Sequence, residues 1–108
     1  MDMQTCIEAC EASRDACTIC AEECQRQGND ANAELAEACA KQCEAAIAAM
    51  KQDSAKECGA CAQLCAECAE MCASMEGEIA ARCAEACARS SEECGKMSAS
   101  MGGQAMLF

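Results

Sequence analysis

Residues 58–72 read CGACAQLCAECAEMC, so that a cysteine recurs after three or four residues from Cys58 to Cys72. Steps of three and four residues place side chains on one face of an α-helix. The residues between the cysteines are mostly Ala, Glu, Gln, Leu and Met, which are strong helix formers. This stretch therefore predicts a helix that carries a continuous row of thiols on one side.

The same spacing recurs along the rest of the chain. Inside four clusters every gap between successive cysteines is three, four or seven residues. The clusters are Cys6, Cys10, Cys17, Cys20 and Cys24; Cys39 and Cys43; Cys58, Cys61, Cys65, Cys68 and Cys72; and Cys83, Cys87 and Cys94. In the two seven-residue gaps, Ser13 and Ser90 stand where a cysteine would continue the row. Each cluster thus predicts one thiol-bearing helix face.

Helix-start and helix-stop signals divide the chain into four helices. We expect them over residues 3–27, over residues 30–51 with a start at Asp30 or Asn32, over residues 54–76 and over residues 78–101. Residues 5–8 and 54–57 fit capping boxes, and Gly28, Gly77 and the pair Gly102–Gly103 suit helix ends. Because the connections are short, the prediction is an all-α fold, an antiparallel up-down-up-down four-helix bundle with a cysteine-lined core. Residues 1–108 form one domain in this prediction, with residues 102–108 as a flexible tail.

The composition is unusual for a folded domain. The 108 residues include 15 cysteines and a single aromatic residue, and the net charge is -11. A chain with so few large hydrocarbon side chains and so high a net charge would ordinarily be expected to be disordered. Reduced cysteine, however, packs as a small apolar side chain. The thiols therefore supply a thin core, and the chain is expected to fold.

The charge and the hydropathy also exclude several functions. An acidic chain offers no basic patch for nucleic acid or for an anionic membrane surface. No apolar run approaches the roughly 20 residues of a membrane span. No secretory signal is visible near residue 1, so we expect a cytoplasmic protein whose thiols stay reduced.

The chemistry of thiolate rows points to a soft metal ion. Two thiolates joined linearly by one ion lie about 4.5 Å apart if each metal–sulfur bond is about 2.3 Å. Residues four apart on a helix have Cβ atoms about 5–6 Å apart, so a single CxxxC turn can hold a two-coordinate ion. Six such turns occur, at 6/10, 20/24, 39/43, 61/65, 68/72 and 83/87. Cu(I) accepts two or three sulfur ligands, and one ion per thiolate cancels the buried charge. We therefore expect storage of many Cu(I) ions, approaching one per cysteine.

Other interpretations of the cysteines stay open. Zn(II) or Cd(II) could be held where four thiols from several helices converge. The chain could be a disulfide-stapled structural module outside the cell, although 15 is an odd number. The thiols could also be a plain small-residue core. An enzyme is not expected, because no thiol has an evident activating base or neighbouring cation.

Residues 58–72 and the segment EACAKQC at residues 37–43 resemble the bacterial copper storage proteins, and the resemblance extends from Cys6 to Cys94. It implies a four-helix bundle whose core cysteines hold many Cu(I) ions, commonly in a homotetramer. Members of that family often carry histidine near the bundle mouth, whereas this chain has no histidine.

Methionines could take over that role. In an up-down-up-down bundle the first helix begins where the second and fourth end, so Met3, Met50, Met97 and Met101 should gather at one pole, together with Met1 and Met106. Neutral thioethers are soft ligands that could pass Cu(I) to the cysteines. The alternative is that they fill the end of the bundle. At Ser13 and Ser90 the hydroxyl is a poor Cu(I) ligand, so we expect the metal array to thin there, unless both simply fill the core.

Overall fold

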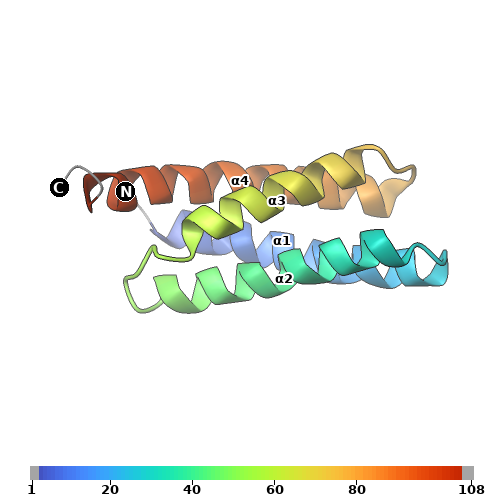
Figure 1. Cartoon of the computed structure of the whole chain (residues 1–108), viewed down its shortest axis with the longest axis horizontal. Coiled ribbons are helices and arrows are strands. Elements are labelled where there is room, and N and C mark those ends of the chain that lie inside the picture. Colours follow the sequence, from blue (N-terminus) through green and yellow to red (C-terminus); the bar gives the residue numbers. More distant parts are fainter. Residues whose placement is uncertain (1–2, 106–108) are drawn as a thin grey trace.

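The computed structural model describes the backbone of residues 3–105 and the side chains of residues 3–100. It contains four α-helices in the order α1 (Met3–Arg26), α2 (Asp30–Met50), α3 (Cys58–Ala73) and α4 (Glu78–Ala105). Successive helices run in opposite directions (Figure 1). No strand occurs within residues 3–105. The predicted all-α up-down-up-down bundle is confirmed.

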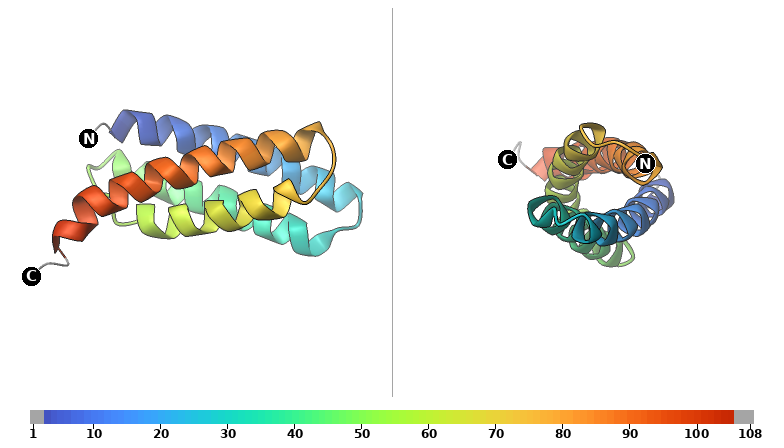
Figure 2. Two further views of the ribbon diagram at one scale, coloured as in Figure 1. Left: turned by 90° about the horizontal axis from the view of Figure 1, so that it is seen from above. Right: turned by 90° about the vertical axis from the view of Figure 1, so that its right-hand side faces the viewer.

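The two ends of the bundle differ in their connections. At one end, which we call the terminal pole, α1 begins, α2 passes into α3, and α4 ends (Figure 1). At the other end, the distal pole, short connections join α1 to α2 and α3 to α4. The view along the bundle shows the four helices surrounding a common axis (Figure 2).

The core lies along that axis and is built from small side chains. All fifteen cysteines are buried. At inward-facing positions that lack a cysteine, the helices mostly bury alanine, such as Ala36 and Ala46 on α2. Ile7, Ile47, Met50 and Met97 add the few larger apolar groups. Thiols therefore take the place that branched hydrocarbons hold in ordinary bundles, because reduced cysteine behaves as a small hydrophobe. Within the described residues, no helix is both long and apolar enough to cross a membrane.

The connection from α1 to α2 follows the sequence signals. Gly28 adopts a φ of 74°, which the lack of a Cβ permits without strain. The N–H of Asn29 donates to the carbonyl of Cys24 at 2.8 Å, and the N–H of Gly28 donates to that of Gln25 at 3.1 Å. These two bonds form a Schellman motif that ends α1. The side chain of Asn29 then caps α2 by accepting a hydrogen bond from the N–H of Asn32.

The predicted start of the third helix at Ser54 is wrong, since α3 begins at Cys58. Asp53 has a φ of 61°. Its backbone N–H donates to the carbonyl of Met50 at 2.9 Å, and the N–H of Ser54 donates to the carbonyl of Ala49 at 2.9 Å. This is again the Schellman pattern. Ser54 is therefore committed to closing α2, and its hydroxyl accepts from Lys56 rather than capping α3.

The ends of α3 and α4 also differ from the prediction. α3 ends at Ala73 rather than near residue 76, and Gly77 turns the chain with a φ of 105°. α4 continues through Gly102 and Gly103 to Ala105 instead of ending at Met101. Glycine lowers helix stability by about 1 kcal/mol relative to alanine but does not forbid the helix, whereas proline would. Of the expected tail, residues 102–105 belong to α4, and residues 106–108 are outside the described residues.

Candidate metal centre

The Sγ atoms of the fifteen cysteines form a line along the bundle axis, which we call the sulfur column. Its closest contacts join α1 to α4. Cys10 and Cys94 lie 3.3 Å apart, and so do Cys17 and Cys87. Cys6 lies 3.6 Å from Cys94. Residues about 70 to 90 positions apart in the chain are thus brought into contact by the antiparallel packing of the first and last helices.

Contacts between the cysteines of α1 and α3 repeat along the bundle axis in the same way. The Sγ separations are 3.9 Å for Cys10–Cys61, 3.7 Å for Cys17–Cys68 and 3.7 Å for Cys20–Cys72. Pairs within one CxxxC turn are no closer, at 3.8 Å for Cys61–Cys65 and 3.9 Å for Cys83–Cys87. The structure therefore brings thiols together mainly across helices, and contacts within single CxxxC turns add to them.

Five groups of cysteines have all their Sγ atoms within 4.8 Å of one another. From the terminal pole to the distal pole, these groups are Cys6, Cys58 and Cys94; Cys10, Cys61 and Cys94; Cys39, Cys43 and Cys65; Cys17, Cys39, Cys68 and Cys87; and Cys20, Cys72 and Cys83. Cys94 and Cys39 each belong to two groups. Sulfur atoms that share one two- or three-coordinate ion lie about 4.5 Å apart or less, so each group matches soft-metal bridging.

Cys24 is the one cysteine outside these groups. It is buried near the distal pole, and its pKa is raised to about 11, first by burial and then by repulsion from Cys20. Both effects disfavour the thiolate. Cys24 therefore keeps its proton in the metal-free protein.

Hydrogen bonds among the thiols shift their pKa values in both directions. The pKa of Cys65 is lowered, first by its hydrogen bond with Cys39. The pKa of Cys39 is raised, first by its hydrogen bond with Cys17, and the pKa of Cys61 is raised, first by its hydrogen bond with Cys10. A monovalent cation that displaces the thiol protons meets sulfur ligands that already contact one another.

Ser13 and Ser90 are both fully buried in the sulfur column. The Oγ of Ser13 lies 3.4 Å from the Sγ of Cys87 and 3.7 Å from that of Cys65. The Oγ of Ser90 accepts from Cys65 at 3.4 Å and donates to Cys10 at 3.5 Å. Their predicted seam positions are confirmed, and both hydroxyls lie among thiols rather than facing solvent.

The predicted methionine pole is only partly described. Met50 and Met97 are buried at 2% and 1% exposure, and Met3 is partly buried against the core. α1 begins, α2 ends and α4 ends at this pole, as expected. The side chain of Met101, like Met1 and Met106, lies outside the described residues.

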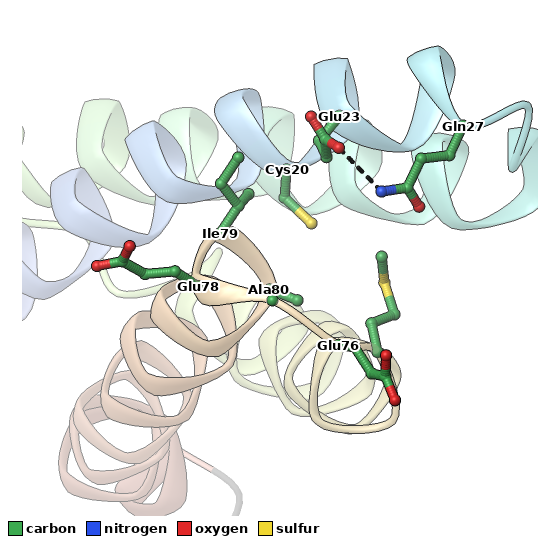
Figure 3. A pocket seen from close by; sticks show the side chains of 9 residues that line it. Cys20, Glu23, Gln27, Glu76, Glu78, Ile79 and Ala80 are labelled. Carbon is green, nitrogen blue, oxygen red and sulfur yellow. Dashed lines mark hydrogen bonds between the residues drawn. The ribbon is translucent and has the colours of Figure 1, made fainter.

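Two other methionines lie near the distal pole, and the sequence interpretation assigned them no metal role. The Sδ of Met71 accepts a hydrogen bond from Cys72 at 3.9 Å. Met75 lines a cavity of about 340 Å³ that reaches the thiol of Cys20 (Figure 3). The cavity is lined by Cys20, Glu23, Gln27, Met75, Glu76, Gly77, Glu78, Ile79 and Ala80. In the sequence, Met71 directly precedes Cys72 and Met75 follows it by three residues, and this spacing was the signal that could have identified the two methionines as neighbours of a thiol.

A four-helix bundle whose axis is filled with mutually contacting thiols defines a protein that binds soft metal ions. The profile of the copper storage protein family matches residues 1–99, and the chain belongs to this family. Comparison with curated protein sequences gives no significant match.

Solved structures support the assignment. The metal-free copper storage protein 3 from Bacillus subtilis is 31% identical, with a TM-score of 0.84, over 90% of this chain and 99% of that chain. A Cu(I)-bound copper storage protein, BsCsp3, is 31% identical with a TM-score of 0.81, over 87% of this chain and 95% of that one. A protein from Nitrosospira multiformis is also 31% identical, with a TM-score of 0.82, over 89% and 94% of the two chains.

Proposed function

We propose that this member of the copper storage family holds many Cu(I) ions on its core cysteines, approaching one ion per thiolate. The observation that carries the proposal is the set of five thiol groups, each with all Sγ atoms within 4.8 Å, that share Cys39 and Cys94. Shared thiolates allow neighbouring ions to be bridged, so that the column accepts a cluster rather than isolated ions. All fifteen cysteines are assigned as ligands, Cys24 included.

The role proposed is storage or detoxification rather than catalysis. The thiols are buried at 0–1% exposure and contact mainly one another. A catalytic thiol needs an exposed position and an activating base or cation. The proposal treats residues 1–108 as one storage domain and places it in the cytoplasm, because reduced thiols persist there.

The methionines of the terminal pole are the second part of the proposal. Met50 and Met97 close the end of the bundle next to which Cys6, Cys58 and Cys94 form the first thiol group. Their neutral thioethers would bind Cu(I) more weakly than thiolates and pass it inward. Met3 and Met101 are assigned to the same role, as expected from the sequence.

Self-association into a homotetramer is the third part, and it is supported by the family resemblance. Ile19 on α1 is 51% exposed and is the large hydrophobic side chain that the described surface leaves open. Burial of this side chain by a second copy of the protein would stabilise the association. Sedimentation of the wild-type protein and of Ile19→Glu tests this part, because a dependence on Ile19 places the interface on that face.

A Zn(II) store is the second candidate, and one observation favours it. Cys17, Cys39, Cys68 and Cys87 form a four-thiol group, the number that a tetrahedral Zn(II) site requires. The other four groups have three thiols each and match the lower coordination of Cu(I).

Anaerobic titration of the reduced protein against a chelator of known affinity distinguishes the candidates. Copper storage predicts retention that approaches one Cu(I) per cysteine. A zinc store predicts few ions and tight binding of Zn(II) under the same competition. If the reduced, folded protein retains only one or two Cu(I) ions, the proposed function is wrong.

A further inference from the structure

The sulfur column has two halves that differ in position. The terminal half contains Cys6, Cys10, Cys58, Cys61 and Cys94. The distal half contains Cys17, Cys20, Cys24, Cys68, Cys72, Cys83 and Cys87. Between them lies a three-thiol group, Cys39, Cys43 and Cys65, which we call the bridge.

On the α1–α4 side, the contact between the two halves is interrupted. Cys10–Cys94 and Cys17–Cys87 are in contact at 3.3 Å, one pair on each side of the interruption. Between these pairs the seam positions belong to Ser13 and Ser90. Ser13 contacts the distal half at Cys87, and Ser90 contacts the terminal half at Cys10. Oxygen is a hard ligand, so a Cu(I) ion at either end of this stretch finds no soft partner across it.

On the α2–α3 side, the sulfur contacts are continuous. Cys61 of the terminal half lies 3.9 Å from Cys43 and 3.8 Å from Cys65. Cys65 lies 3.5 Å from Cys39, which shares a four-thiol group with Cys17, Cys68 and Cys87 of the distal half. Among the described residues, each of these links between the halves passes through the bridge. Cys65 has the central position, since it contacts Cys39, Cys43, Cys61 and both serine hydroxyls.

We propose that the bridge is the relay through which Cu(I) passes between the two halves, and that Ser13 and Ser90 confine the ions to it. The inference rests on the proposed function, because it concerns the movement of stored copper. An ion moves when a new Cu–S bond forms as an old one breaks. The receiving thiol gives its proton to the thiolate that is released, and copper remains in the +1 state. Each step needs a second sulfur within about 4.5 Å, twice a metal–sulfur bond, and the bridge meets this requirement where the serines do not.

The arrangement also divides the cargo. Ions in the terminal half and ions in the distal half form two clusters that share ligands only through Cys39, Cys43 and Cys65. Removal of Cys65 alone leaves a path, because Cys43 lies 3.9 Å from Cys61 and shares a thiol group with Cys39. Removal of the thiols at both Cys39 and Cys65 should therefore isolate the halves while leaving the groups at either end intact. A thiol lost from an end group should reduce capacity without isolating anything.

The test compares the double variant Cys39→Ser/Cys65→Ser with the control Cys58→Ser/Cys72→Ser, which removes two buried thiols, one from each end of the column. Anaerobic Cu(I) loading is followed over time, and circular dichroism confirms the helix content of each variant. In Cys39→Ser/Cys65→Ser we expect a second loading phase at least about tenfold slower than the first, equivalent to about 1.4 kcal/mol of added barrier. The control variant should load in one phase with slightly lower capacity. If Cys39→Ser/Cys65→Ser loads in one phase like the control, the relay is wrong.

A gain-of-contact variant gives an independent check. Ser13→Cys combined with Ser90→Cys supplies soft ligands on the interrupted side, so adding both to Cys39→Ser/Cys65→Ser should remove the slow phase. A slow phase that persists in this folded quadruple variant contradicts the confining role of the serines. The outcomes stay separate from those of the proposed function. If wild-type protein retains only one or two ions, copper storage itself fails, whereas full wild-type loading with one-phase kinetics in Cys39→Ser/Cys65→Ser overturns only the relay.

Discussion

Cys17 on α1 and Cys87 on α4 place their Sγ atoms 3.3 Å apart, although 70 residues separate them in the chain. Both belong to the four-thiol group that also includes Cys39 and Cys68, so every helix contributes one ligand to it. A group assembled from four helices depends on the whole bundle and on no single turn. Metal bound there links all four helices, and its binding free energy becomes folding free energy.

The first prediction concerns this pair. Cys17→Ser combined with Cys87→Ser should lower the Cu(I) capacity by about two ions if each thiolate balances one ion, since serine keeps the volume but is a poor soft ligand. Chelator-competed titration measures the loss. Thr18→Ser, an exposed change on the same helix, is the matched control and should leave capacity unchanged. Undiminished capacity in the folded double variant would contradict the assignment of these thiols.

The second prediction concerns the stability of the metal-free protein at alkaline pH. The pKa of Cys24 is raised from 9.0 to about 11, first by burial, and the pKa of Cys43 is raised to about 12, first by its hydrogen bond with Cys10. A raised folded-state pKa favours the folded protein while the group is protonated. This contribution is complete below pH 9 and is lost as the pH rises through the folded-state values.

Thermal denaturation of the reduced, metal-free protein should therefore show a falling midpoint from about pH 9 to about pH 12. The copper-loaded protein should not show this fall, because the bound metal has already displaced the thiol protons. Cys24→Ala should weaken the dependence in the metal-free protein. A flat midpoint over this range would contradict burial of protonated thiols.

The sequence predicted which face of each helix is buried but not which cysteines meet. Steps of three and four residues place Cys10 and Cys94 on inward faces, and they place Ser13 and Ser90 in line with them. Whether Cys10 lies opposite Cys94 or Cys87 depends on the axial offset and rotation of α1 against α4. Those are set by the packing of alanine and thiol side chains over the whole interface, which no local spacing records.

Helix ends were predictable where one residue had one role. Gly28 could only favour the left-handed position that closes α1, and it does so. Ser54 had two possible roles, because a serine before Ala-Lys-Glu can cap the next helix while its N–H can also close the preceding one. The Schellman motif centred on Asp53 decided in favour of α2. The sequence does not reveal such competition, since Asp53 is an ordinary residue for a turn and not a strong signal for a positive φ.

The third prediction uses the cap of α2. The side chain of Asn29 accepts a hydrogen bond from the N–H of Asn32 at 3.3 Å. Asn29→Ala should destabilise the metal-free protein by about 1 kcal/mol, which lowers the melting midpoint by about 4–8 °C for a domain of this size. Asn32→Ala is the matched control, because it keeps the backbone N–H that Asn29 uses. An equal loss in both variants would show that the cap is not the cause.

Bound copper should mask the destabilisation caused by Asn29→Ala. Ions that bind only the folded state stabilise it by mass action, so the loaded protein should unfold well above the metal-free midpoint whether or not Asn29 is present. Differential scanning calorimetry of metal-free and loaded samples measures both effects. If copper leaves the midpoint unchanged, the ions are not bound in the folded core.

The fourth prediction decides which pole admits copper. Met50 and Met97 are buried at the terminal pole, whereas Met75 lines a cavity that reaches Cys20 at the distal pole (Figure 3). If the terminal methionines pass ions inward, Met50→Leu combined with Met97→Leu should slow loading without changing capacity. Leucine fills nearly the same volume, so the cost to folding should stay below about 1.5 kcal/mol per site.

Met75→Leu is the matched control, because it removes a thioether from the opposite pole. Stopped-flow loading with a Cu(I)–chelator complex measures the rates of both variants under the same competition. Slower loading in the double variant alone supports uptake at the terminal pole. The reverse pattern would assign Met50 and Met97 to closing the bundle end and would place uptake at the cavity, where Cys20 connects directly to the group that contains Cys72 and Cys83.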